Sequence, residues 1–383
     1  MRPFFLSLFV LTLTLFSCKV TKKAYESGDY ETAVFNSIER LRKSPNNKKS
    51  RETLKLAYPE LVETLLDQVA QESRSSNPLR YERMADHYDL LNKIHDEIRR
   101  SPAAKKVITN PRFFGSEYAE ATQRSAEARY ALGKQELDRG RQGDRESAKE
   151  AYYHFAKAQE WQPGYRDAAD QQMEALDYAT ILIQIESIPM HSRALQLSNE
   201  FFENQLAEYI ASAPFSPFVR FLVPGEASRL NRQPDQILQM TFDDFVVGQA
   251  YVKETVSERL RDSVVVGEVE IKEDSVADVY GTVEAKVHRF HKEISSRGLL
   301  DFRVLDARSG AVITQQKFPG TFIWVDRWGY YQGDKRALDE EDQQYMRKNR
   351  ELPNPPPQDL FIEFTRPIFS QVTNFVGNYY QNY

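Results

Sequence analysis

Cysteine is almost absent from this chain of 383 residues, which contains only Cys18. One cysteine excludes an intrachain disulfide and a metal site built from several thiolates. Long apolar runs are also absent, because the run from Phe4 to Phe16 is shorter than the about 20 residues that span a bilayer as a helix. Basic residues are not in excess, since 51 Lys and Arg stand against 56 Asp and Glu. The net charge of −5 gives no general attraction for nucleic acid, and we expect no nucleic-acid partner.

The motifs of common enzyme classes are missing too. The sequence contains no Gly-x-Ser-x-Gly, no His-Glu-x-x-His, no glycine-rich phosphate loop and no dinucleotide-binding fingerprint. His288 and His291 lie three residues apart in a predicted strand, so they point to opposite faces and do not easily share a metal ion. We therefore expect a protein that is not an enzyme and that needs neither a cofactor nor a metal.

Two acidic groups allow more than one interpretation. Asp243 and Asp244 are adjacent, so one faces each side of a strand, and we expect them to end that strand rather than to act as an acid/base pair. The segment 339–342 is entirely acidic and could attract a cation. It lacks the alternating ligands and turn glycine of a calcium loop, which favours a solvated loop or the start of a helix.

Cys18 follows a segment with the features of a secretory signal. A basic start precedes the apolar core from Phe4 to Phe16, and a small residue, Ser17, stands just before the cysteine. The ending Leu15-Phe16-Ser17-Cys18 resembles the lipobox of bacterial lipoproteins. That resemblance implies cleavage before Cys18 and acylation of its thiol and new amino group, which would anchor the chain permanently. The alternative is an ordinary thiol in a signal or core helix.

The residues after Cys18 bear on the location of the chain. Lys19, in place of Asp, implies by analogy with bacterial lipoproteins an outer rather than an inner membrane. No acidic cluster follows in residues 19–25, which by the same analogy favours the periplasmic side. We expect a lipid-anchored protein of the bacterial envelope, at the outer membrane and facing the periplasm.

From Thr21 to about Ala175 the apolar pattern has a helical period. Apolar residues recur at spacings of three and four, and Pro, Asn, Ser and Gly clusters separate the periodic stretches. We predict helices over 30–43, 50–73, 79–100, 114–139, 146–161 and 165–177.

Parts of this helical half carry a repeat pattern in which small residues alternate with a large one before a proline. The pattern occurs at Gly28-Asp29-Tyr30, Ala33 and Pro45, and again at Leu132-Gly133, Ala151, Phe155, Ala158 and Pro163. These spacings resemble tetratricopeptide repeats, which implies a helical array with a groove for a protein partner. The first repeat would overlap Cys18 and the second has an insertion at 139–145, so a generic helical bundle is the alternative.

After about Asp177 the apolar period changes from 3.6 to 2. We predict a first strand over 181–185, a helix through Leu195 and Tyr209, and further strands over 218–223, 238–242, 279–287, 300–304 and 312–318, with a turn at 306–310. A closing helix carries apolar residues at spacings of three and four from Phe361 to Tyr379. The whole chain is thus predicted to be α+β, a helical, tetratricopeptide-like array followed by a mostly antiparallel sheet with covering helices. The predicted boundaries are 1–17 for the signal peptide, 18–177 for the helical region and 178–383 for the α/β domain.

The α/β half resembles a domain shared by the curli-channel lipoprotein, the amino-terminal domain of TolB and the lipoprotein activators of cell-wall synthases. The resemblance rests on the strand 181–185, the helix around 199–210, the hairpin of 300–310 with its Val-Leu-Asp-x-x-x-Gly pattern, and the closing helix. It covers about 180 residues and implies a binding or assembly role in an envelope rather than catalysis.

An aromatic cluster over 318–331 is the candidate recognition site, formed by Phe322, Trp324, Trp328, Tyr330 and Tyr331. Phe322 and Trp324 share one face of a predicted strand. We place Trp328 and the tyrosines in the loop beyond it, and expect Trp328 and Tyr331 to be more exposed than Trp324. Exposed aromatic residues at a strand end are typical of sugar or protein recognition. The alternative is a hairpin whose aromatic residues cap the domain core.

These observations predict a noncatalytic envelope lipoprotein that acts as a protein-binding adaptor or as an accessory factor for assembly or secretion. Its expected partners are the membrane, through the lipid at Cys18, and an envelope protein. A function of another class, binding of peptidoglycan or another carbohydrate by the aromatic cluster, is the alternative.

Overall fold

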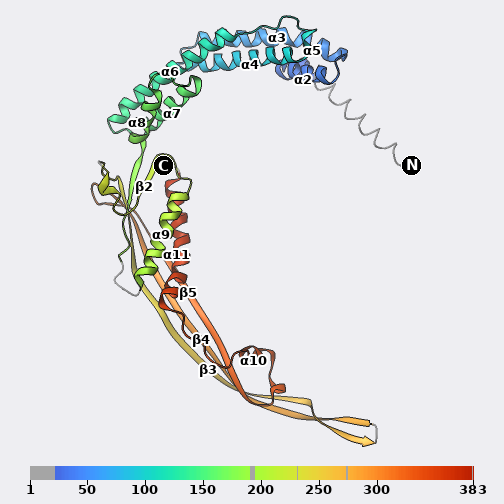
Figure 1. Cartoon of the computed structure of the whole chain (residues 1–383), viewed down its shortest axis with the longest axis vertical. Coiled ribbons are helices and arrows are strands. Elements are labelled where there is room, and N and C mark those ends of the chain that lie inside the picture. The colour runs from blue at the N-terminus through green and yellow to red at the C-terminus, as the bar shows by residue number, and fades with distance from the viewer. Residues whose placement is uncertain (1–21, 190–194, 231, 273–274, 382) are drawn as a thin grey trace. The chain divides into compact units, whose positions relative to one another are not determined.

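The computed structural model describes residues 22–189, 195–230, 232–272, 275–381 and 383 (Figure 1). The chain falls into two compact units that divide between Ala179 and Thr180. The described part of the first unit is helical, and the second unit contains a five-stranded sheet with helices. The predicted α+β class is confirmed: a helical array precedes a mostly antiparallel sheet. Cys18 and the predicted signal peptide lie outside the described residues.

The helices of the first unit follow the predicted pattern closely. Each of the six predicted helices is present, with its ends within three residues of the prediction. The short helix α5 and the helical residues 22–26 were not predicted. The helices are α2 (Tyr30–Lys43), α3 (Lys48–Ser73), α4 (Arg80–Arg100), α5 (Pro102–Lys105), α6 (Gly115–Arg141), α7 (Arg145–Trp161) and α8 (Ala168–Ala179).

Local capping explains where several of these helices begin. The side chains of Asp29, Asn47 and Asp144 accept hydrogen bonds from backbone N–H groups three residues later, at 3.1, 3.0 and 3.2 Å. Such caps satisfy N–H groups that have no partner inside the helix and typically stabilise it by about 1 kcal/mol. The helix starts are therefore determined by residues close in sequence.

Small residues allow α6 and α7 to pack closely. A Cβ atom at Gly133 would lie only 2.9 Å from Cε1 of Phe155, and one at Gly140 would lie 2.9 Å from Cβ of Ala148. Ala151, Phe155 and Ala158 are all fully buried. Gly133, Ala151, Phe155 and Ala158 of the repeat pattern therefore face the helix contact rather than solvent.

The sheet of the second unit has the order β2-β1-β3-β4-β5. Its strands are β1 (Ile181–Ile185), β2 (Val219–Leu222), β3 (Gln236–Lys272), β4 (Ser275–Asp306) and β5 (Val312–Gly333). The short strand β1 pairs in parallel with β2 and with the start of β3. The long strands β3, β4 and β5 pair antiparallel, so most of the sheet is an antiparallel meander.

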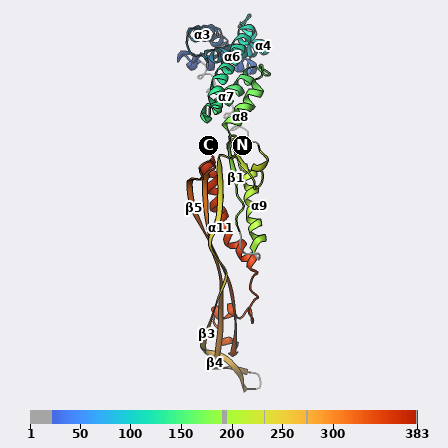
Figure 2. The same cartoon turned by 90° about the vertical axis from the view of Figure 1, so that its left-hand side faces the viewer.

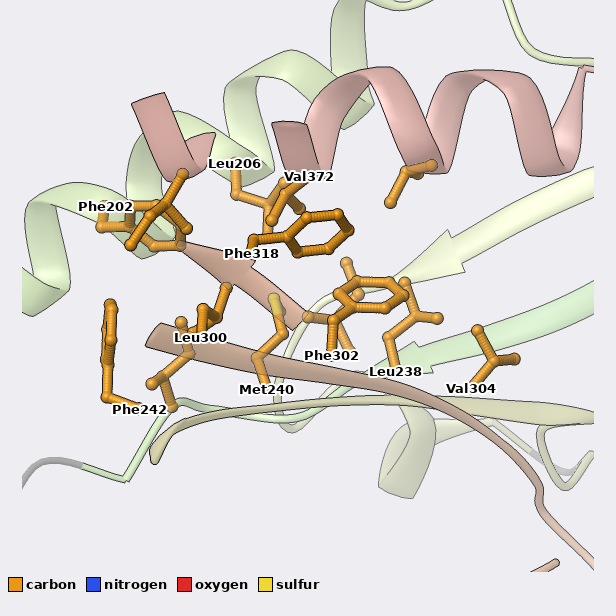
Figure 3. Packing of buried hydrophobic residues seen from close by; sticks show 14 of the residues in the cluster. Phe202, Leu206, Leu238, Met240, Phe242, Leu300, Phe302, Val304, Phe318 and Val372 are labelled. Atoms are coloured by element: carbon orange, nitrogen blue, oxygen red, sulfur yellow. The ribbon is translucent and has the colours of Figure 1, made fainter. Parts of the chain in front are cut away.

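The main core of this unit lies between the sheet and two helices, α9 (Gln196–Ser212) and α11 (Pro357–Tyr380) (Figure 3). Strand residues Met240, Phe302 and Phe318 pack there against Phe202 of α9 and Val372 of α11. This core covers only the part of the sheet near the carboxyl end of β4. Figure 2 shows β3 and β4 continuing well beyond the helices.

The strands are much longer than predicted, and this overturns two expectations. Asp243 and Asp244 do not end a strand, because β3 passes through them with a register shift between Phe242 and Asp244. The residues after Trp324 do not form a loop, because β5 continues to Gly333. Both segments continue as strands because their backbones pair with β4, although apolar and polar residues no longer alternate along them. The acidic segment 339–342 starts a helix, α10 (Glu340–Tyr345), and Asp339 and Asp342 form its capping box.

Candidate functional site

The predicted aromatic cluster lies on β5 and is matched by aromatic residues of β4. Trp328 pairs with Phe290 and Tyr330 with His288 across the two strands. The Phe290 and Trp328 rings stack with centroids 5.2 Å apart at an angle of 5°, and the His288 and Tyr330 rings stack at 4.5 Å and 11°. Such cross-strand pairs stabilise the sheet by their contact alone.

The five candidate residues do not form one exposed platform. Phe322 packs against the main core, and Tyr331 packs on a second, smaller apolar cluster. Trp328 is 8% exposed, whereas Trp324 is half-buried and Tyr330 is 43% exposed. The expectation that Trp328 is more exposed than Trp324 was wrong, because β5 does not end before Trp328 and Phe290 covers one face of its ring.

The segment that follows β5 is held to the sheet by buried charged groups. Asp342 is fully buried and accepts a 2.7 Å hydrogen bond from Nε of Arg259 on β3. Lys292 of β4, 3% exposed, donates to Glu351 and Asn354. Because an unpaired buried charge costs several kcal/mol, these contacts favour one position of residues 339–354.

Asp326 of β5 is a second buried acid in this arrangement. Burial acts to raise the pKa of its carboxyl group, but hydrogen bonds from the backbone N–H of Leu352 and from Lys348, at 2.8 and 3.0 Å, outweigh it and leave the pKa below its usual value. The ionised aspartate therefore holds the segment 348–352 against β5. All of these groups are satisfied by partners in the chain, which indicates a structural role.

The smaller apolar cluster lies nearer the amino-terminal end of β4 than the main core does. Val283, Ala285 and Val287 pack there against Ala337 and Leu338, with Val264, Tyr331 and Met346 at its margin. The chain segment after β5 thus covers this part of the sheet. β5 ends at the pairing of Gly333 with Ala285, and the cover by the segment after β5 extends only a little further, to Val283 and Val264.

Beyond that point β3 and β4 form a two-stranded ribbon, residues 262–272 and 275–283 (Figure 2). Val269 pairs with Ala277 and Gly267 with Val279, so these four residues share one face. The same face continues along the ribbon from the smaller cluster. We call it the apolar face; it consists of Val264, Val266, Gly267, Val269, Ile271, Ala277, Val279, Gly281 and Val283.

The apolar face is uncovered over most of its length. Val266, Val269 and Ile271 are 48%, 55% and 63% exposed. The opposite face contains the pairs Glu268–Asp278 and Glu270–Val276. The sequence from 262 to 283 has six acidic residues and one basic residue. The ribbon thus has one aliphatic face and one mixed face, on which Glu268, Glu270 and Asp278 lie beside Val265, Val276 and Tyr280.

The sequence interpretation missed this surface, although a signal was present. Val264, Val266, Val269 and Ile271 are spaced for one strand face apart from two register shifts, between Val265 and Gly267 and between Glu270 and Lys272. The run Val264-Val265-Val266 hides the alternation because three valines are consecutive. Only the pairing with β4 separates them into two faces.

Other candidate chemistry is limited in the described part of the chain. His288 contacts Glu254 at 2.8 Å and His291 contacts Glu293 at 2.9 Å, and the two histidines lie on opposite faces of β4 as predicted. Among the described residues, no three His, Cys, Asp or Glu side chains are grouped as a metal site. None of the helices in the described ranges is long and apolar enough to cross a membrane.

No protein-family model and no curated protein matches the chain. Among solved structures, the chain is similar to one from Helicobacter pylori that is described as a "putative neuraminyllactose-binding hemagglutinin homolog". The match covers 53% of this chain and 90% of that chain, with 12% sequence identity and a TM-score of 0.24. A likeness of this degree supports no statement about function.

Proposed function

We propose that this protein is a noncatalytic, lipid-anchored adaptor of the bacterial envelope that binds a protein partner. The observation that carries the proposal is the uncovered apolar face of the ribbon. Contiguous exposed apolar surface bordered by polar residues is typical of protein interaction sites. The lipid anchor is supported by the signal-like segment that ends in Leu15-Phe16-Ser17-Cys18.

The low stability expected of an isolated two-stranded ribbon also favours a partner. A two-stranded antiparallel pair is only marginally stable in water unless another element covers its apolar face. The chain's own residues, Ala337 and Leu338, cover the base of this face but not the part around Val269. A partner that continues this cover would extend an apolar contact that already exists.

The charge of the ribbon narrows the chemistry of the partner. With six acidic residues and one basic residue, it is repelled by anionic lipid surfaces. It is complementary to a protein surface that has an apolar centre and a basic rim. We therefore assign the ribbon to a protein partner of that kind.

The helical unit supports the same class of function. Small residues bring α6 and α7 together as in a repeat hairpin, and arrays of such hairpins bind proteins along a concave surface. The glycan-binding alternative is weaker, because Trp328 is stacked and buried and Phe322 belongs to the core. Of the five residues of the aromatic cluster, Tyr330 alone has an exposed ring.

The adaptor proposal is tested by two valine variants of the ribbon. Val269→Asp places a charge on the apolar face, whereas Val276→Asp places the same charge on the opposite face at a similar exposure, 61% against 55%. Crosslinking of the lipidated protein in detergent-solubilised membranes should lose its main adduct, by about tenfold or more, in Val269→Asp but not in Val276→Asp. Equal yields from the two variants would overturn the proposal.

The purified protein alone provides the second measurement. If its mass in solution is that of a dimer, and Val269→Asp makes it monomeric, the apolar face binds a second copy of the chain and not another protein. That result would also overturn the adaptor proposal. A monomeric protein with a Val269-dependent crosslink supports it.

A further inference from the structure

A basic cavity lies in the helical unit at the corner between α2, α3 and α5. Its volume is about 350 Å³, within the range of pockets that hold small ligands. It is lined by Leu41, Arg42, Pro45, Asn46, Arg51, Ser101, Pro102, Ala103 and Lys106. Three of these residues are cationic, and none is acidic.

Two of the three cations are available to a ligand. In the described part of the chain, neither the Arg51 nor the Lys106 side chain makes a hydrogen bond or ion pair. Arg42 is already oriented, since its guanidinium donates to the carboxylate and, at 3.3 Å, to the backbone oxygen of Glu97. Guanidinium and ammonium donors converging from separate helices form an arrangement suited to a multivalent anion.

The charge around the cavity strengthens this interpretation. Segments 40–51 and 99–106 together contain ten basic residues and no acidic residue, although the whole chain has a net charge of −5. A local excess of one sign raises the concentration of counter-ions around a recessed site. Three of these ten basic residues, Arg42, Arg51 and Lys106, line the cavity itself.

We propose that this cavity binds a phosphate group. The three oxygens of a phosphate group can accept hydrogen bonds from Arg51 and Lys106, and Arg42 and the Asn46 amide are further donors. Two sources share this chemistry, a free phosphate ester and the headgroup of an anionic lipid. The proposal itself does not depend on the adaptor function or on acylation.

The headgroup source rests on the proposed lipid anchor. Cys18 precedes Lys22, the first described residue, by four positions, which span at most about 14 Å of extended chain. Lys22 lines a second cavity of about 320 Å³ together with Lys49 and Ser50 of the first turn of α3, and with two acidic residues, Glu26 and Glu52. Arg51 follows on the same turn, so an acylated Cys18 would keep this end of the helical unit near headgroups.

The test uses a chain that starts at Lys19, which retains every described residue and has no acylation site. The double variant Arg51→Gln/Lys106→Gln removes the two unpaired cations. Lys55→Gln/Arg74→Gln is the control: both residues are exposed, lie outside the cavity and change the net charge equally. Calorimetry with glycerol phosphate measures the free ester, and co-flotation with phosphatidylcholine vesicles, with and without phosphatidylglycerol, measures the headgroup.

We expect the cavity variant to weaken binding by roughly tenfold, the effect of losing charge-assisted hydrogen bonds, and the control to change it by less than about twofold. Loss only with vesicles assigns the site to lipid headgroups, and loss only with the ester assigns it to a soluble ligand. No binding in either assay, or equal loss in the control, overturns the proposal. The absence of the acyl chain keeps these outcomes independent of whether Cys18 is lipidated.

Discussion

Replacing Gly320 with alanine should destabilise the packing of the sheet against its covering helix, α11. Gly320 of β5 pairs with Gly298 of β4, so two glycines face each other across the strands. A Cβ atom at Gly320 would lie 2.2 Å from the backbone oxygen of Phe364 and 2.6 Å from Cγ1 of Ile368, both on α11. The two glycines thus form the notch into which α11 packs.

The size of the effect follows from what would have to move. Contacts of a Cβ atom below 3.0 Å are essentially never seen, so α11 or β5 must shift by most of an ångström. The obstacle at Phe364 is backbone, and a rotamer change does not relieve it. Overpacking of a core costs about 1–3 kcal/mol, and we expect the upper end here. For a domain of about 200 residues, ~3 kcal/mol lowers the Tm by roughly 6–12 °C.

Tryptophan fluorescence during thermal unfolding measures this change in the second unit alone. Two of the three tryptophans, Trp324 and Trp328, lie on β5, and Trp161 lies in α7. A Trp161→Phe background therefore leaves a signal that comes only from the sheet. Gly320→Ala is compared in that background with the unmodified glycine.

Gly267→Ala is the matched control, since Gly267 is also a strand glycine and nothing lies within 4 Å of a Cβ placed there. It should leave the Tm nearly unchanged. A Gly320→Ala midpoint within about 2 °C of the control would show that α11 does not pack on β5 in this way.

Four further outcomes are expected. Ala151→Leu should overpack the buried contact of α7 and destabilise the helical unit by about 1–3 kcal/mol in urea titration; an unchanged midpoint would place this alanine in solvent. Trp328→Ala should cost about 3–5 kcal/mol of stability and affect glycan or partner binding only through unfolding, so reduced binding at an unchanged midpoint would restore a recognition role. Cys18→Ser should abolish incorporation of labelled fatty acid and membrane retention, and persistent acylation would refute the lipoprotein assignment. The pKa of Asp326 is lowered in the folded protein, so the stability that its charge contributes is present above the pKa of the unfolded chain and is lost as the pH falls through the folded pKa. Asp326→Asn should therefore reduce the loss of stability at acid pH, and a pH–stability profile identical to that of the unmodified protein would contradict this role.

The helical unit could be predicted well because its signals are local. Asp29, Asn47 and Asp144 act as caps within three residues of the groups that they satisfy. The apolar spacing of three and four is likewise complete within each helix. The helix α5, one turn long, was not predicted, because four residues contain too little of a helical period.

The candidate site could be predicted only in part, because exposure is not a local property. The sequence placed Phe322 and Trp324 on one strand face, which the continuous β5 preserves. It could not show that Phe290, 38 positions away, covers Trp328. Nor could it separate the ribbon valines into two faces, since that required the register with β4.

The sequence by itself determined the α+β class, the order of the elements, and the limits of most helices, because these depend on period and capping within short segments. The tertiary structure alone decided the length of β3, β4 and β5, the burial of Trp328 and the uncovered apolar face around Val269. A strand extends as far as its neighbour offers hydrogen bonds, and a side chain is buried only if another element reaches it. Both conditions depend on residues distant in sequence, which is why the surface proposed to bind a partner becomes visible only in the folded chain.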